Sequence, residues 1–222
     1  MTRRLFALGI TLLIPFLYVV RLQDLRKHTL GFELAFFVAF VLYAGITILA
    51  LRVREFSWRA LLAVFALAAV MQALLVFTSP TLSDDMYRYV WDGRVQALGI
   101  DGETGISPYL YAPDAPQLAG LRDRKIWPHI NRKSAVTVYP PAAQMAFALL
   151  WRIWPDNVHW LQLVMAASGL LAGGLLVGLL KELGLSAARV LIYLWSPLLA
   201  FETAHSAHVD ALVLPLLVGA WW

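Results

Sequence analysis

Long apolar runs separated by short polar segments dominate the pattern of hydrophobic and polar positions along this chain. A helix needs about 20 apolar residues to cross a bilayer, and several runs reach or approach that length. We therefore expect membrane-spanning helices at residues 5–22, 32–51, 60–78, 158–180, 189–204 and 208–222. The run at 141–154 has only about 14 residues, roughly 21 Å of helix. It could be interfacial, re-entrant or a short tilted span.

These runs predict an all-α fold, a polytopic transmembrane helical bundle with three parts. Residues 1–78 would hold the N-terminal transmembrane helices, residues 79–141 a large loop, and residues 142–222 further transmembrane helices. The loop is far longer than the usual connection between helices. Its aromatic residues and singly placed prolines are typical of ordered chain. Because the last run stops after about 15 residues, we expect the chain to be the front part of a longer protein.

Positive charges near the ends of the runs predict the orientation. Arg3 and Arg4 precede the first run, and three arginines lie in the second loop at 52–59. Loops rich in Lys and Arg tend to stay in the cytoplasm, so the loop at 79–141 is expected outside, in a multi-pass protein of the cell inner (cytoplasmic) membrane. The basic residues at 21–27 count against this orientation. If 141–154 crosses the membrane, the sides of the later loops are exchanged.

Composition agrees with a membrane protein and removes several functional classes. Hydrophobic residues make up 60% of the chain and charged residues 14%, against roughly 45–50% and about 25% in soluble domains. The chain has no cysteine, which excludes disulfides, thiol nucleophiles and thiolate metal sites. The net charge of +4 is spread along the chain, so membrane lipids are expected partners and nucleic acid is not.

A polar and aromatic segment, SDDMYRYVWDGRVQALG, follows the third run directly. Pro80 ends that run, Ser83 is a good N-cap, and Gly99 suits a C-terminal stop. We therefore expect an amphipathic juxtamembrane helix at 84–98. At about 100° per residue, one face would carry Met86, Tyr89, Val90, Gly93 and Ala97 and the opposite face Asp85, Arg88 and Asp92. This pattern predicts a helix that lies on the membrane surface.

The adjacent acids Asp84 and Asp85 have two interpretations. They could be ordinary first-turn charges favoured by the helix dipole, with Arg88 bridging Asp85 and Asp92. Alternatively, one carboxylate stays unpaired and serves as a general base, or as a ligand for a divalent cation such as Mg²⁺ or Mn²⁺. The spacing favours the first interpretation, and their place beside a membrane span, among aromatic residues, weakens it.

Basic residues gather further along the loop, around the segment IWPHINRKSAVTVYPP. His129 and Asn131 lie between two basic groups, which consist of Arg122, Arg124 and Lys125 before them and Arg132 and Lys133 after them. This group could be a solvated edge that faces lipid headgroups. It could instead form a cradle for a phosphate or diphosphate.

A second polar cluster, FETAHSAHVDAL, stands at the end of a late apolar run. His205 and His208 are three residues apart and could share a helix face, near Glu202 and Asp210. A metal site is conceivable, but no convincing third and fourth ligand can be placed. Ionisable groups in membrane segments are costly and often functional, so contacts to donor phosphate or acceptor hydroxyls are the favoured role. The alternative is a simple polar break between two spans.

The segments SDDMYRYVWDGRVQALG, SPYLYAPD, IWPHIN, VYPPAAQ and LWSPLLAFETAHSAHVDAL follow one another in a specific order. Together they resemble the bacterial mannosyltransferase-like members of the GT-C class, polytopic glycosyltransferases that use polyprenyl-phosphate sugars. The resemblance covers about residues 78–212. DGETGIS, at 101–107, looks like an insertion where relatives run directly into Asn-Pro-Tyr, here Ser107-Pro108-Tyr109.

The resemblance implies transfer of a hexose, with mannose favoured, from a polyprenyl-phosphate donor to a lipid or glycan hydroxyl at the extracytoplasmic face, with inversion. It implies that Asp84 or Asp85 is the base. Because the carrier phosphate is already a good leaving group, the enzyme mainly has to deprotonate the acceptor and stabilise the phosphate. Candidate substrate-binding residues are Arg88, His129, Asn131, Arg132, Lys133, Tyr139, His205, His208 and Asp210.

Two other classes of function remain open from the sequence. A transporter or flippase for a lipid-linked substrate would use its acids and histidines as a proton relay. Such a protein would have broken helices in paired halves, with charges near the middle of the bilayer. A noncatalytic membrane scaffold would not need an acid pair beside a basic rim.

Overall fold

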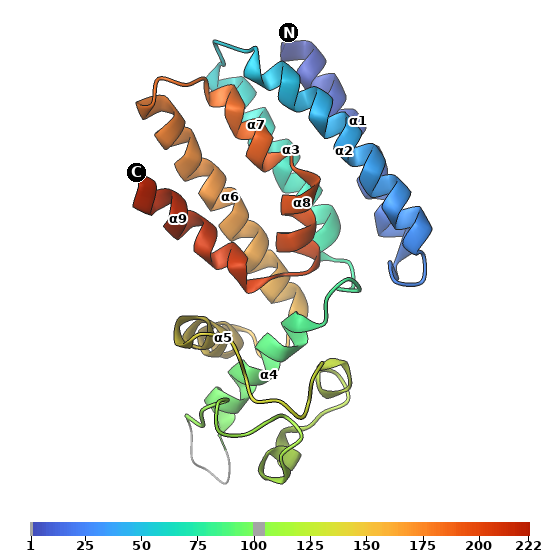
Figure 1. The fold of residues 1–222 in the computed structure, drawn as a ribbon, viewed down its shortest axis with the longest axis vertical. Helices are drawn as coiled ribbons and strands as arrows, with labels where there is room; N and C mark the ends of the chain where they lie inside the picture. Colours follow the sequence, from blue (N-terminus) through green and yellow to red (C-terminus); the bar gives the residue numbers. More distant parts are fainter. Residues whose placement is uncertain (1, 100–104) are drawn as a thin grey trace. The chain divides into compact units, whose positions relative to one another are not determined.

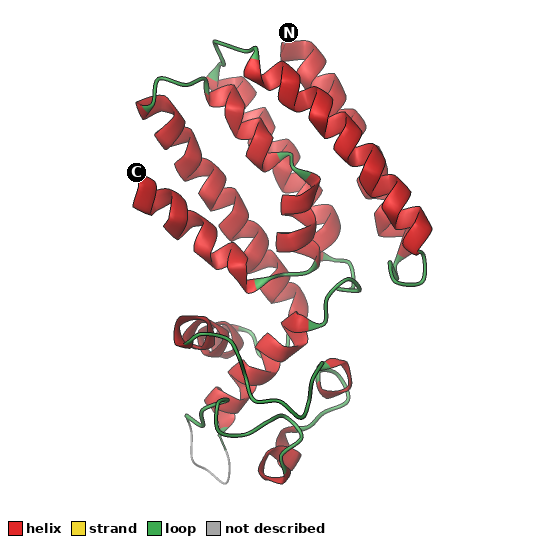
Figure 2. Cartoon of the chain, viewed as in Figure 1, coloured by secondary structure: helices red, strands yellow, loops and turns green. Residues whose placement is uncertain are grey.

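The computed structural model describes residues 2–99 and 105–222, and within these ranges it contains helices and loops but no strand (Figure 2). The all-α class expected from the sequence is confirmed. The predicted insertion at 101–107 falls mostly outside the described residues. Internal contacts divide the chain into two units. One unit consists of residues 1–82 and 162–222, and the other of residues 83–161.

The unit of residues 1–82 and 162–222 carries the membrane-spanning candidates. Among the described residues, four helices are long and apolar enough to cross a bilayer. They are α1 (Thr2–Leu22), α2 (Thr29–Leu51), α3 (Trp58–Val76) and α6 (Val158–Glu182), whose first turn belongs to the other unit. The spans expected at 5–22, 32–51, 60–78 and 158–180 are thus confirmed as apolar helices of spanning length. α1 and α2 pack along each other (Figure 1).

The last part of this unit is more broken than its apolar runs predicted. It consists of α7 (Val190–Leu194), α8 (Pro197–Ala200), a π-helical turn η4 (Phe201–His205), a 3-10 turn η5 (Val209–Leu212) and α9 (Val213–Trp221). The expectation of two separate spans at 189–204 and 208–222 is therefore wrong. Pro197 has no N–H to continue a helix and begins a new one. The pair Pro197–His205 and Val209–Trp221 is bent by 106° and is either a fifth, broken span or a re-entrant loop.

Aromatic packing fastens the broken segment to the first helices. Trp195 is fully buried, and its indole N–H donates to the carbonyl of Val64 at 3.0 Å. A Cβ on Gly9 would lie 2.5 Å from the Trp195 ring, so only glycine lets α1 approach this closely. The Phe201 ring lies 5.6 Å from that of Phe16. Large side chains on the outer faces of α1 and α2 stay exposed, as expected for helices that face lipid.

The unit of residues 83–161 is built on two crossing helices, α4 (Asp85–Leu98) and α5 (Pro141–Ile153). They touch at Gly93, where an added Cβ would lie 2.5 Å from the carbonyl oxygen of Phe147 and 2.9 Å from the Cβ of Trp151. The Tyr89 and Phe147 rings stack at 4.5 Å beside this contact. The ambiguous run at 141–154 is thus a helix that packs on α4, in the unit formed by the loop.

Two short 3-10 helices, η1 (Pro116–Leu121) and η2 (Trp127–His129), occur in the chain between α4 and α5. Arg94 of α4 organises this part of the loop. Its guanidinium donates to Asp123 at 2.5 Å, to Asp156 at 2.7 Å and to the carbonyl of Leu121 at 2.8 Å. Burial alone would raise the pKa of Asp123, but hydrogen bonds from Arg94 and from two backbone N–H groups lower it to about 2. Ion pairs of Arg94 therefore link α4 to the loop, a role that disulfides have in many extracellular domains.

The expected helix at 84–98 forms, but its surroundings differ from the prediction. It ends at Leu98, and Gly99 has the positive φ of 70° that favours glycine. Asp84 takes the N-cap position, and the Ser83 hydroxyl accepts from the N–H of Asp85 at 3.3 Å. The expected position of this helix on the membrane surface stays a prediction, but its polar face is not open to solvent. Arg88 and Asp92 are only 5% and 1% exposed, because their hydrogen-bond partners lie on α5 and on residues 131–139.

Candidate functional site

A cavity of about 320 Å³ lies in the unit of residues 83–161, between the first turns of α4 and the segment 131–139. Its lining brings together five residues that the sequence marked as site candidates. These five are Asp85, Arg88, Asn131, Arg132 and Tyr139, and the lining is completed by Ala135, Val136 and Val138. We describe this cavity as the candidate site.

Asp85 is the first residue of α4 and is partly exposed to the cavity. Its Oδ1 accepts a hydrogen bond from the amide of Asn131 at 2.8 Å. The predicted bridge from Arg88 to Asp85 is not among the ion pairs of the described residues, so that half of the prediction is wrong. The helix N-terminus favours a negative charge here. Asp85 is therefore a carboxylate held by one neutral partner, with its other oxygen available to a ligand.

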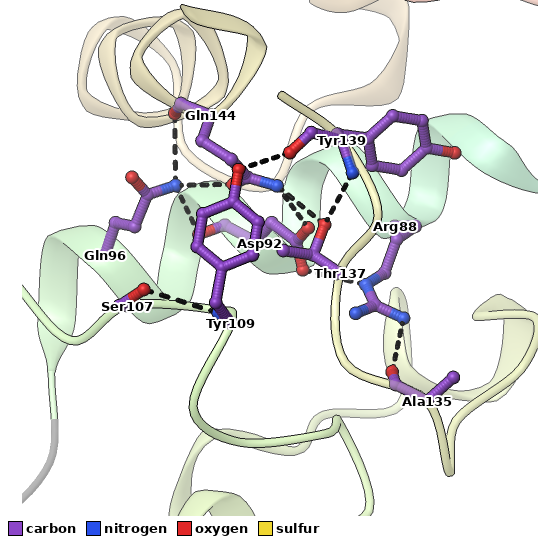
Figure 3. Close-up of polar contacts among 9 residues, drawn as sticks. All are labelled: Arg88, Asp92, Gln96, Ser107, Tyr109, Ala135, Thr137, Tyr139 and Gln144. Carbon is purple, nitrogen blue, oxygen red and sulfur yellow. Dashed lines mark hydrogen bonds and ion pairs between the residues drawn. The ribbon is translucent and has the colours of Figure 1, made fainter. Parts of the chain in front are cut away.

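Arg88 lies one turn further along α4 and is held from two sides. Its Nε donates to Oδ1 of Asp92 at 2.8 Å, and its Nη1 donates to the carbonyl of Ala135 at 3.1 Å (Figure 3). Its Nη2 is buried and has no hydrogen-bond partner among the described residues. A buried donor without a partner costs about 1–3 kcal/mol. An anion in the cavity would remove this cost, since guanidinium groups bind phosphate and carboxylate oxygens well.

A buried polar network supports Arg88, and sequence reasoning missed most of it. The Gln144 amide on α5 donates to Asp92 at 2.8 Å and to the hydroxyl of Thr137 at 2.7 Å (Figure 3). Burial raises the pKa of Asp92, while Arg88, Gln144 and Thr137 act in the opposite direction. The i,i+4 spacing did predict the Arg88–Asp92 pair. The one signal for Gln144 was an isolated amide in an otherwise apolar run.

The 131–139 side of the cavity carries both charged and apolar groups. Arg132 is exposed, adopts a φ of 44° and forms no ion pair within the described part of the chain. Burial raises the pKa of Tyr139, and the charge of Asp85 raises it further, so this phenol is neutral. Val136 and Val138 are 42% and 85% exposed. They form an apolar edge beside the two arginines.

Three of the candidates from the loop lie outside this cavity. Asp84 precedes Asp85 and is not part of the lining. The exposed His129 ring stacks on Tyr87 with centroids 4.7 Å apart. Lys133 donates to the carbonyl of Pro128 at 3.2 Å and lies over the Trp127 ring. Position in the cavity therefore favours Asp85 over Asp84, and Arg132 over Lys133, as groups that can meet a ligand.

His205 belongs to the other unit and is a buried, fully bonded residue. Its Nε2 accepts from the N–H of Thr81 at 3.3 Å, and its Nδ1 lies 2.9 Å from the Thr78 hydroxyl. Both ring nitrogens are thus used within the protein, which fits a neutral ring with its proton on Nδ1. This arrangement indicates a structural role in joining the end of α3 to the π-helical turn.

His208 and Asp210 also lie in that unit, beyond the bend. The prediction that His205 and His208 share a helix face is wrong, because the π-helical turn ends at His205 and Ala207 turns the chain with a φ of 49°. His208 pairs through Nδ1 with Glu202, and Asp210 is exposed. A second cavity, of about 430 Å³, lies in this unit among apolar side chains, and its lining includes Glu202, His208 and Asp210.

Within the described ranges, no three His, Asp or Glu side chains are placed together as a metal site. Mg²⁺ binds readily through one or two carboxylates with the remaining ligands supplied by substrate phosphates and water. A divalent cation at Asp85 would therefore take most of its ligands from substrate and solvent.

Comparison of the chain with protein-family models, with curated proteins and with solved structures gives no match. The resemblance to GT-C glycosyltransferases thus stays a prediction from the sequence motifs.

Proposed function

We propose that this chain transfers a hexose, with mannose as the favoured sugar, from a polyprenyl-phosphate carrier to a lipid or glycan hydroxyl. One observation carries the proposal. The Asp85 and Arg88 side chains line the same cavity, and the buried Nη2 of Arg88 has no partner among the described residues. A base and an anion-binding group are the two functions that this transfer requires.

In the proposed reaction, Asp85 takes the proton of the acceptor hydroxyl while the acceptor oxygen forms a bond to the anomeric carbon of the sugar. The bond from that carbon to the carrier phosphate breaks, and its electron pair leaves with the phosphate. Arg88 and Arg132 stabilise the negative charge that develops there. The neutral Asn131 amide donates to one oxygen of the Asp85 carboxylate. The carboxylate can therefore still accept a proton.

The surroundings of the cavity support a lipid-linked substrate. The exposed Val136 and Val138 offer apolar surface next to the arginines, which suits an isoprenoid chain joined to a phosphate. The four helices of spanning length indicate a membrane protein. The extracytoplasmic location of the loop, in the inner membrane, follows from the positive charges near the N-terminus and is part of the proposal.

The test uses purified full-length protein, a polyprenyl-phosphate hexose labelled in the sugar, and candidate lipid and glycan acceptors. The wild type should form labelled product and free carrier phosphate, and Arg88→Lys should reduce the rate because an ammonium cannot reproduce the fixed guanidinium. Asp114→Asn, an exposed acid in the same unit, is the matched control and should retain activity. Absence of sugar transfer by the wild type with every acceptor would contradict the proposal.

A second candidate function, transport of a lipid-linked substrate, is favoured by one observation. The bent pair Pro197–His205 and Val209–Trp221 holds a hydrogen bond between Glu202 and His208 beside a cavity, and broken helices with ionisable groups are typical of transporters. The same labelled carrier distinguishes the two functions. Movement of intact carrier across vesicles without cleavage of the sugar would favour transport.

A further inference from the structure

We propose that Gln144 is a positioning residue, which acts through Asp92 to hold the Arg88 guanidinium toward the cavity. Gln144 lies on α5 and does not line the candidate site, whereas Arg88 does. This inference rests on the function proposed above, because it assigns to Arg88 the binding of the phosphate.

A chain of hydrogen bonds connects Gln144 on α5 with Arg88 on α4 (Figure 3). Gln96 donates to the Gln144 side-chain oxygen at 2.9 Å, and Gln144 donates to Oδ2 of Asp92 at 2.8 Å. Oδ1 of Asp92 then accepts from Nε of Arg88 at 2.8 Å. Each residue fixes the orientation of the next one, and the last member is the guanidinium.

The chemistry of the network requires an amide at position 144. Because the Gln144 oxygen faces an N–H donor on Gln96, its nitrogen must face Asp92 and Thr137, which both offer acceptor oxygens. A leucine of similar size could not donate, and an ionised carboxylate would repel Asp92. The side-chain chemistry of Gln144, in addition to its volume, therefore determines how Asp92 is oriented.

Stability alone gives a poor reason for this network. Arg88, Asp92, Thr137 and Gln144 are each at most 5% exposed, and buried ion pairs are often no more stable than apolar side chains of similar size. Among these four side chains, the atom without a partner in the described structure is Nη2 of Arg88. A network that leaves one guanidinium donor without a partner, on a side chain that lines the cavity, is suited to a ligand.

The test measures the dissociation constant of a soluble short-chain isoprenyl phosphate, citronellyl phosphate, for the full-length protein. Gln144→Leu and Arg88→Lys should each weaken binding, by about tenfold. The double variant should bind no more weakly than Arg88→Lys, because a lysine does not have the planar group that the network orients. Gln72→Leu removes an equally buried amide from the other unit and should leave the constant unchanged.

The outcomes separate this inference from the proposed function. If Arg88→Lys leaves binding unchanged, the anion site itself is wrong. If Arg88→Lys weakens binding but Gln144→Leu does not, only the positioning role is wrong. Equal further weakening by Gln144→Leu in the wild-type and Arg88→Lys backgrounds would also overturn the inference, since a general loss of stability acts in both.

A second variant covers the case in which Gln144→Leu does not fold. In Gln144→Glu, the protonated carboxyl can donate to Asp92, whereas the ionised form repels it. The charged groups near this position are Asp92 and Arg88 on α4, with the Tyr139 phenol neutral on the 131–139 segment. The ratio of its dissociation constant to that of the wild type should fall as the pH is lowered from about 8 to about 5.5. A constant ratio would contradict a positioning role.

Discussion

Asp85 and Arg88 are one helical turn apart, yet each is held by a different partner and both line one cavity. The sequence predicted the two residues, the Arg88–Asp92 spacing and the acidic helix start. It could not predict that Asn131, 46 positions later, would donate a hydrogen bond to Asp85, since that contact depends on how the loop folds back. It also gave little weight to Gln144, because an amide in an apolar run shows no partner until α5 meets α4.

Arg94 and Asp123 form an ion pair between α4 and the loop. The pKa of Asp123 in the folded protein is about 2, below the ordinary value of about 3.9. Its contribution to stability is therefore complete above about pH 4 and is lost as the pH falls toward 2. Because Asp123 is partly exposed, we expect Asp123→Asn to lower the free energy of unfolding at pH 7 by only about 1 kcal/mol.

Tryptophan fluorescence during denaturant unfolding measures this effect, since Trp127 accompanies Asp123 in the loop. The difference between wild type and Asp123→Asn should shrink as the pH is lowered from about 5 to about 2. A difference that stays constant over this range would show that the ion pair does not hold this part of the loop.

At the scale of elements, periodicity predicted well where local sequence decides the outcome. The helix at 84–98 and four long spans formed as expected, because caps, length and apolar content are local properties. The late spans did not, because Pro197 and the polar ETAH segment interrupt a run that looks continuous by hydropathy. The sequence also did not predict that both faces of α4 are buried, because α5 and residues 131–139 cover them.

α4 and α5 cross at Gly93, where the two helices are in close contact. A Cβ there would lie 2.5 Å from backbone of α5, and a carbonyl oxygen cannot move aside as a flexible side chain can. Gly93→Ala should therefore push the helices apart, with a cost of about 1–3 kcal/mol in unfolding free energy and weaker binding of citronellyl phosphate. Gly120→Ala, in open space within the same unit, is the control and should change neither quantity.

The structure supports a helical membrane protein, and its described residues contain four candidate spans, or five if the bent pair is one span. Length and hydropathy made this class predictable from the sequence. The prediction of which side of the membrane each loop faces depends on charge alone. The arginines near the N-terminus and the basic first loop favour opposite orientations.

The absence of cysteine from the sequence makes the orientation directly measurable. Cysteines introduced one at a time at the exposed Arg124 and Glu55 should react differently with a membrane-impermeant maleimide added to intact cells. We expect Arg124→Cys to be labelled and Glu55→Cys to be labelled only after lysis. The reverse pattern would place the candidate site in the cytoplasm and contradict the proposed extracytoplasmic location.

In the proposed reaction, Asp85 is the base of a sugar transfer in the 320 Å³ cavity. This role is tested by single-turnover transfer from a labelled polyprenyl-phosphate hexose, compared between Asp85→Asn and Asp84→Asn. We predict that Asp85→Asn slows transfer by about 10²–10⁴-fold and still binds citronellyl phosphate, because Arg88 is intact, while Asp84→Asn stays within a few-fold of the wild type. Transfer by Asp85→Asn at the wild-type rate would contradict the claim.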